Sequence, residues 1–193
     1  MENPKDYGFN SQLIHYSGHH DQYGAATVPI YQTSTFAFAS AQDGADCFAG
    51  VKPGYMYTRI GNPTVKALER QVALLEHACD SVALASGMAA VSCVYLALLN
   101  AGDHVVSSSA VYGASRVLME QHMSRFGVES TYVNTADIDA VKAAIKPNTK
   151  MIYIETPANP TMEISDIAAC AEIAHKAGAL LVVDNTFCSP YLS

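Results

Sequence analysis

The chain has 193 residues, of which 50% are hydrophobic and 15% are charged, so it has enough apolar material for one substantial core and is not a disordered segment. Its net charge of −7, with no run of Lys or Arg, argues against binding to nucleic acid or to an anionic membrane. The five cysteines are scattered, which favours reduced thiols over a disulfide framework or a zinc site. Reduced thiols are typical of the cytoplasm, so we expect a cytoplasmic protein. The first residues lack the apolar core of a signal peptide, and no apolar run approaches membrane-spanning length.

Residues 1–50 show no clear helix or strand period and carry many Gly, Pro and aromatic residues. We predict an irregular amino-terminal arm that packs on a neighbouring subunit. Its side chains that could bind a metal are His15, His19, His20 and Asp21. Gly18 disfavours the helix that a histidine pair four residues apart would need, so surface histidines are the better interpretation and no metal site is predicted.

Two residues of the next segment form a candidate anion clamp. Tyr57 and Arg59 are two positions apart, so in an extended segment their side chains point to the same side. A phenol and a guanidinium together can bind a phosphate, although an ordinary exposed pair is the alternative. Asn62 and Pro63 then predict the start of a helix, as N-cap and first helical residue. Its apolar stripe consists of Val65, Leu68, Val72 and Leu75.

The remainder of the chain alternates between predicted strands and helices. The strands are expected at 81–86, 104–108, 128–133, 150–155 and 179–183, and the helices at 88–99, 112–126, 137–145 and 166–176. Repeated β-α-β units with short loops predict an α/β fold, with three α/β/α layers around a mostly parallel sheet. The sequence has no G-x-G, so the dinucleotide-binding fingerprint is absent. The P-loop, G-x-S-x-G and H-E-x-x-H motifs are missing too.

Polar residues follow several of these strands. Ser86 and Gly87 come just before a helix, whose start offers free N–H groups and a positive dipole to an anion, although a plain tight turn is the alternative. Asp184 ends the apolar run 179–183, which is typical of a strand buried on both faces. In open α/β sheets the carboxyl ends of the strands are where ligands bind. Capping of the following turn by the Asp184 side chain is an equal alternative.

These residues together suit one kind of ligand. The Ser86–Gly87 turn can hold a phosphate, the ring of Tyr112 can stack on a flat heterocycle, and Asp184 can pair with a ring N–H⁺. The loop 155–160 lies at another strand end and can face the same cavity. A flat, phosphorylated, cationic heteroaromatic such as pyridoxal 5′-phosphate fits this description.

Several longer motifs carry a family resemblance. They are Y-T-R-I-G-N-P-T at 57–64, A-S-G-M-A-A at 85–90, V-Y-G at 111–113, Y-I-E-T-P-A-N-P-T at 153–161 and V-V-D-N-T-F-C-S-P-Y at 182–191. On these stretches the chain resembles the Cys/Met-metabolism (trans-sulfuration) family of pyridoxal-phosphate enzymes. The motif Y-G-F-N at 7–10 is most similar to its methionine γ-lyase branch.

The resemblance implies a role for each matched residue. Tyr57 and Arg59 would bind the cofactor phosphate of the neighbouring subunit. Backbone N–H groups at Gly87 and Met88, next to Ser86, would bind the phosphate of the chain's own cofactor. Tyr112 would stack on the ring and assist proton transfer as the catalytic residue. Asn159 would contact the ring hydroxyl, and Asp184 would keep the pyridine nitrogen protonated.

The resemblance also implies a fold and a reaction. Residues 51–193 would form the cofactor-binding large domain of the aspartate-aminotransferase type, incomplete because the family's Schiff-base lysine lies in an S-x-T-K stretch downstream of S-P-Y. We therefore expect the chain to be the amino-terminal part of a carbon–sulfur lyase for a sulfur amino acid, a dimer or tetramer when whole and inactive alone. The alternatives are an O-acetylhomoserine sulfhydrylase and a fragment that keeps the fold only. Ala114, where methionine γ-lyases usually carry Cys, leaves the substrate open and is expected near its leaving group.

Overall fold

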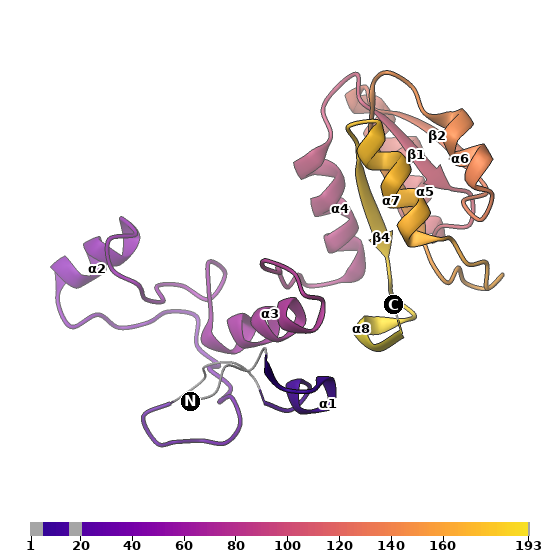
Figure 1. The fold of residues 1–193 in the computed structure, drawn as a ribbon. Coiled ribbons are helices and arrows are strands. Elements are labelled where there is room, and N and C mark those ends of the chain that lie inside the picture. Colours follow the sequence, from indigo (N-terminus) through magenta and orange to yellow (C-terminus); the bar gives the residue numbers. More distant parts are fainter. Residues whose placement is uncertain (1–5, 16–20, 193) are drawn as a thin grey trace. The chain divides into compact units, whose positions relative to one another are not determined.

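The chain divides into two compact units, Met1–Ala83 and Leu84–Ser193. The structure is a computed structural model and describes residues 6–15 and 21–192 (Figure 1). None of the helices within these ranges is both long and apolar enough to span a bilayer.

The first unit contains three helices within its described residues: α1 (Phe9–Gln12), α2 (Ala41–Phe48) and α3 (Pro63–Leu75). Apart from these helices and an isolated bridge between Thr35 and Tyr57, most of the described chain up to residue 62 is irregular. The segment 1–50, predicted to be irregular, therefore contains a helix, α2, that the sequence did not predict. The side chain of Asn62 accepts a hydrogen bond from the backbone N–H of Thr64 (2.9 Å), and Pro63 is the first helical residue. The predicted start of this helix is therefore confirmed.

The apolar stripe of α3 is only partly covered. Val65, Leu68 and Val72 are 39%, 56% and 37% exposed, whereas the small residues Ala67 and Ala73 are buried. The helix is therefore present as predicted, but a large part of its apolar face is exposed among the residues that the structure describes.

The predicted strand at 81–86 is wrong. This segment is irregular, and its backbone is held by α3 rather than by a neighbouring strand. The Ser81 hydroxyl donates to the Glu69 carbonyl (2.6 Å), and the backbone N–H of Ala83 donates to Glu69 Oε1 (3.0 Å). A short apolar run forms a strand only where a partner strand is available. Here the hydrogen bonds to Glu69 replace those that a partner strand would make.

The second unit is built on a four-stranded parallel sheet in the order β2-β1-β3-β4. The strands are β1 (His104–Ser108), β2 (Glu129–Val133), β3 (Thr149–Glu155) and β4 (Leu180–Asp184). The helices are α4 (Gly87–Leu98), α5 (Gly113–Val117), α6 (Ile138–Ala144), α7 (Ile167–Lys176) and α8 (Ser189–Leu192). A π-helical turn, η2 (Leu118–His122), and a 3₁₀ turn, η3 (Met123–Phe126), extend α5.

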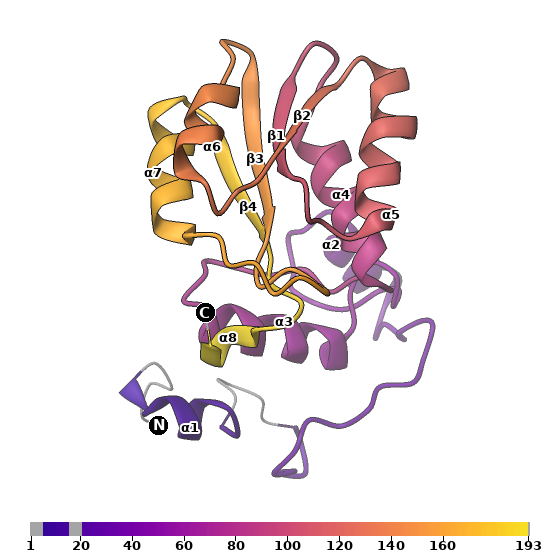
Figure 2. The same ribbon diagram turned by 90° about the vertical axis from the view of Figure 1, so that its right-hand side faces the viewer.

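Helices cover both faces of this sheet, which confirms the three-layer α/β/α prediction. Figure 2 shows α6 and α7 on one face and α4 and α5 on the other. Because side chains alternate along a strand, β3 serves both layers. Met151 and Tyr153 belong to the core cluster on the α4 and α5 side, and Ile152 and Ile154 to the cluster on the α6 and α7 side. All four are at most 2% exposed.

Strand β4 is less buried than predicted. Leu180 is 49% exposed, and the residues after it are half-buried. Within the described chain β4 pairs only with β3, so it lies at the edge of the sheet. Strand β1, which has a neighbour on each side, is buried along its whole length. A continuous apolar run therefore did not distinguish an edge strand from a central one.

His104, the first residue of β1, is fully buried between two threonines. Its Nδ1 lies 2.9 Å from Thr149 Oγ1 and its Nε2 lies 2.8 Å from Thr131 Oγ1. Burial lowers the pKa of His104 below its usual value of 6.5. Because the unfolded chain then takes up a proton more readily than the folded one, the free energy of unfolding falls as the pH drops below about 6.5.

We expect His104→Asn to be less stable than the wild type at pH 7.5 by about 1–3 kcal/mol, because a buried hydroxyl loses its partner. The variant should also lose less stability between pH 7.5 and pH 5, because it has no imidazole to protonate. Urea unfolding of both proteins across this range measures the difference. Equal pH slopes would show that His104 does not contribute to the acid sensitivity.

Candidate functional site

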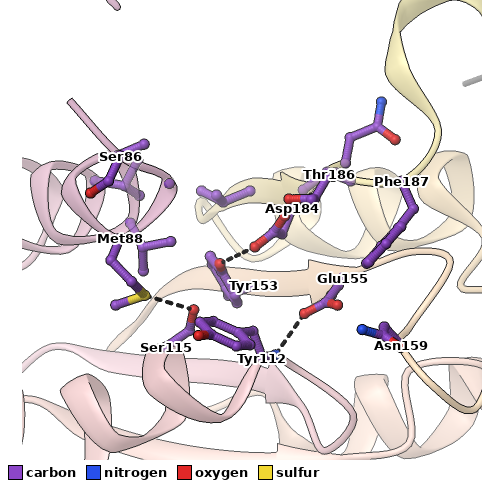
Figure 3. A pocket seen from close by; sticks show the side chains of 17 residues that line it. Ser86, Met88, Tyr112, Ser115, Tyr153, Glu155, Asn159, Asp184, Thr186 and Phe187 are labelled. Carbon is purple, nitrogen blue, oxygen red and sulfur yellow. Dashed lines mark hydrogen bonds between the residues drawn. The ribbon is translucent and has the colours of Figure 1, made fainter. Parts of the chain in front are cut away.

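A cavity of about 770 Å³ opens at the carboxyl ends of β3 and β4 in the second unit (Figure 3). Its walls come from the first turns of α4, from the segments that follow β1 and β3, and from the end of β4. The lining residues are Ser86, Gly87, Met88, Ala90, Val91, Val94, Tyr112, Ser115, Tyr153, Glu155, Asn159, Val182, Val183, Asp184, Asn185, Thr186 and Phe187.

The start of α4 forms one wall of the cavity. Ser86 is the N-cap, and its hydroxyl accepts a hydrogen bond from the backbone N–H of Ala89 (3.1 Å). The N–H groups of the residues that follow an N-cap have no partner inside the helix, so those of Gly87 and Met88 are available to a ligand. A Cβ atom added to Gly87 would meet no atom of the protein within 4 Å. Internal packing therefore does not require a glycine here, and the space beside it is open.

Tyr112 presents its ring to the cavity from the residue just before α5. Its side chain is 59% exposed, while its backbone N–H donates to Glu155 Oε2 at 2.6 Å. Glu155, the last residue of β3, is only 4% exposed. Burial raises the pKa of the Glu155 carboxyl, and the nearby Asp184 raises it further, while the bond from Tyr112 acts in the opposite direction. The end of β3 thus fixes the backbone position of Tyr112.

Asp184 uses its two carboxylate oxygens differently. Oδ1 accepts hydrogen bonds from the hydroxyl (2.6 Å) and the backbone N–H (3.3 Å) of Thr186, so the predicted cap of the following turn is present. Oδ2 accepts a hydrogen bond from the hydroxyl of Tyr153 at 3.1 Å. The side chain also lines the cavity. The two interpretations of Asp184 are therefore compatible, because capping the turn leaves the carboxylate facing the ligand space.

The structure brings most of the predicted site residues together. Ser86, Gly87, Met88, Tyr112, Asn159 and Asp184 all line this cavity.

Tyr57 and Arg59 belong to the other unit. The Arg59 guanidinium lies 5.2 Å from the centre of the Tyr57 ring, and both residues are exposed. Residues 58–60 form a turn rather than the extended segment that was expected. Phenol and guanidinium nevertheless lie side by side, so the pair remains a candidate anion clamp.

Sequence reasoning missed two buried polar residues of the cavity, Tyr153 and Ser115. Tyr153 is 2% exposed and lies inside the strand predicted at 150–155, where its spacing of two from Glu155 places both side chains on one face. Ser115 is fully buried, and its hydroxyl donates to the sulfur of Met88 at 3.7 Å. Ala114, expected near a leaving group, is half-buried and is not one of the residues that line the cavity. Its place relative to a leaving group therefore stays a prediction.

The charges and surfaces of the cavity define the ligand it can hold. The start of α4 favours an anion, and Asp184, on another wall, favours a cation or a strong hydrogen-bond donor. Tyr112, Val91, Val94, Val182 and Phe187 supply apolar and aromatic surface. Within the described residues, no group of three or more His, Cys, Asp and Glu side chains is placed to hold a metal ion. His19 and His20 lie outside the described residues, so the interpretation of that cluster stays a prediction.

Comparison with known proteins gives consistent matches. An L-methionine γ-lyase of Fusobacterium nucleatum subsp. polymorphum is 46% identical over 97% of this chain and 48% of its own length. An O-succinylhomoserine sulfhydrylase of Pseudomonas aeruginosa is 47% identical over 84% of this chain and 40% of its own length. The crystal structure of cystathionine γ-lyase from Lactobacillus plantarum, complexed with L-serine, superposes with a TM-score of 0.85 at 43% identity. That match covers 96% of this chain and 46% of the other.

The chain therefore spans about half the length of the curated relatives it matches. The family model for Cys/Met metabolism PLP-dependent enzymes matches residues 10–193, which is nearly the whole chain. With this match and the cavity at the strand ends, the chain belongs to the Cys/Met metabolism family of pyridoxal-phosphate-dependent enzymes.

Proposed function

We propose that the cavity binds pyridoxal 5′-phosphate and that the chain supplies the cofactor-binding part of a carbon–sulfur lyase for a sulfur amino acid. The observation that carries the proposal is the meeting of a helix start, an aromatic ring and a carboxylate in one cavity. When bound, the cofactor supplies an electron sink for negative charge that develops on the substrate.

The start of α4 fits the phosphate group. The backbone N–H groups of Gly87 and Met88 and the hydroxyl of Ser86 lie at the positive end of a 12-residue helix. The missing Cβ of Gly87 lets the phosphate approach the backbone, and no atom of the protein fills that space. Because these donors belong to the backbone of a helix, they are in place before the ligand arrives.

Asp184 and Tyr112 fit the ring. The Asp184 carboxylate would hold a proton on the pyridine nitrogen, because a carboxylate favours a neighbouring cation over a neutral group. The ring of Tyr112 would stack on the heterocycle, and its hydroxyl would give or take a proton beside the substrate. Asn159 would donate its side-chain amide to the ring hydroxyl.

The reaction proposed for the whole protein is elimination of a thiol from methionine or cystathionine. The names of the relatives support this class, since they include a methionine γ-lyase and a cystathionine γ-lyase. Replacement on an O-acyl-homoserine is the second candidate, because one relative is an O-succinylhomoserine sulfhydrylase. A chain that keeps the fold without catalysis is the third, and we expect residues 1–193 alone to show no turnover.

Two measurements test the proposal. Pyridoxamine 5′-phosphate, which has no aldehyde to react with surface lysines, should bind the chain at least about 100-fold more tightly than pyridoxamine, since several charge-assisted hydrogen bonds hold the phosphate. Next, the chain should be joined to the carboxy-terminal half of the Fusobacterium γ-lyase and assayed with methionine, cystathionine and O-acetylhomoserine. Equal affinities for the two amines would contradict the cofactor site, and products of replacement alone would favour the sulfhydrylase.

Self-association is part of the proposal. Tyr57 and Arg59 would bind the cofactor phosphate of a neighbouring subunit, and residues 1–50 would pack on that subunit, in a cytoplasmic dimer or tetramer. Both side chains are exposed, and the Arg59 guanidinium lies 5.2 Å from the centre of the Tyr57 ring. This arrangement supports binding of a ligand that lies outside their own unit.

Mixing two defective chains tests this arrangement. Arg59→Ala and Asp184→Asn chains should each bind pyridoxamine 5′-phosphate weakly. If Arg59 acts across the interface, a hybrid dimer contains one site with both groups intact, and tight binding returns to a fraction of the sites. Calorimetric titration of the mixture measures that fraction. If Arg59 acts within its own chain, every site stays defective and no tight binding returns.

A further inference from the structure

Tyr153 lines the cavity, and its hydroxyl contacts Asp184. It donates to Oδ2 at 3.1 Å, and its ring packs edge-on against Tyr95 at 5.4 Å between centroids. Burial raises the pKa of Tyr153, and the nearby Asp184 raises it further, so the hydroxyl keeps its proton and acts as a donor.

The strand register explains why these groups meet. Tyr153 pairs with Val182 and Glu155 pairs with Asp184 across β3 and β4. Residues two apart on a strand share a face, so all four side chains point to the α4 and α5 side of the sheet. Tyr153 pairs with the residue two positions before Asp184, so strand pairing rather than a flexible loop sets its position relative to Asp184.

The hydrogen bonds at Asp184 leave little acceptor capacity for a ligand. A carboxylate has about four lone-pair positions. Thr186 donates to Oδ1 twice, and Tyr153 donates to Oδ2 once. Among the described residues, no other side chain or backbone group donates to this carboxylate. Oδ1 therefore has both of its lone-pair positions occupied, and the free position lies on Oδ2. A ring N–H would therefore share one oxygen with the hydroxyl of Tyr153.

We propose that Tyr153 and Thr186 are positioning residues, which fix the direction of the Asp184 carboxylate and divide the proton between its Oδ2 and the ring nitrogen of the cofactor. The proposal rests on the proposed function, because it needs a pyridine ring in the cavity. Donors on a carboxylate make it less basic, so the proton stays on the nitrogen. Without them the more basic carboxylate takes a larger share of the proton.

The test is the ¹⁵N chemical shift of the ring nitrogen in [¹⁵N]pyridoxamine 5′-phosphate bound to the chain. In the wild type the shift should be that of a protonated ring. In Tyr153→Phe, which keeps the ring against Tyr95, it should move toward the unprotonated value, and the Kd should rise about 3- to 10-fold. Thr186→Val should act in the same direction and Thr186→Ser should restore the wild-type shift. Thr186 is exposed, so its variants keep the proposal testable if Tyr153→Phe does not fold.

Tyr132→Phe is the matched control, because Tyr132 lies on β2 and does not line the cavity. A wild-type chain that does not bind the probe with a protonated ring would overturn the proposed function, and this proposal with it. Protonated binding in the wild type with an unchanged shift in Tyr153→Phe and Thr186→Val would overturn the positioning role alone. A shift that moves equally in Tyr132→Phe would also overturn it.

Discussion

Asp184→Asn is expected to reduce turnover by at least about 100-fold in the chain joined to the carboxy-terminal half of a relative, while the protein stays folded. The loss of one preorganised electrostatic partner at a reacting group has an effect of this size. Asparagine keeps an oxygen that can accept from Thr186 or Tyr153, but it carries no charge to hold a proton on the pyridine nitrogen. The measurement is kcat with methionine, together with the thermal unfolding midpoint.

A chemical rescue separates the charge from the shape of Asp184. A cofactor analogue methylated on the ring nitrogen is permanently cationic, so it should recover a part of the activity of Asp184→Asn. The same analogue should lower the activity of the wild type, where the methyl group meets Oδ2. Near-normal turnover of Asp184→Asn with the ordinary cofactor would contradict the proposed role and leave Asp184 as a cap of the turn at Thr186.

Gly87→Ala is expected to weaken the binding of pyridoxamine 5′-phosphate about 100-fold without loss of stability. The added methyl group meets no atom of the protein within 4 Å, so the fold has no reason to change. Alanine also favours the helix relative to glycine. The methyl group would occupy the space through which the phosphate reaches the backbone N–H groups. Fluorescence titration and urea unfolding measure the two effects separately.

Gly113→Ala serves as the control for this variant. Gly113 is the first residue of α5 and also has open space beside it, but it does not line the cavity. Its alanine variant should keep the wild-type affinity. Equal affinities of the Gly87 and Gly113 variants would place the phosphate away from the start of α4.

The sequence predicted the parts of the fold that depend on local chemistry. Asn62 before Pro63, and Ser86 before Gly87, each mark a helix start because their side chains satisfy free N–H groups within three residues. The strands β1 to β4 were found because their apolar runs are short and separated by helix-length segments. The polar residues at their carboxyl ends then predicted the cavity, since parallel strands bring those ends to one edge.

The parts that failed depend on contacts between distant residues. Residues 81–86 have the composition of a strand, but Glu69 provides their hydrogen bonds. The exposure of Leu180 depends on strand order, which the apolar pattern of β4 does not contain. Tyr153 was missed because an aromatic residue in a buried strand is usually core, and only the register with β4 places its hydroxyl on Asp184.

The helical segment after β1 combines a fixed beginning with an irregular middle. Glu155 holds the backbone of Tyr112, and Ser115 contacts Met88, so its first turn is tied to the sheet and to α4. The π-helical turn η2 comes one turn later, at Leu118–His122. Such a turn takes up one extra residue within a helix. An insertion or deletion near residue 120 would thus lie downstream of both anchoring contacts, and it would remove neither of the hydrogen bonds that tie the first turn to the sheet and to α4.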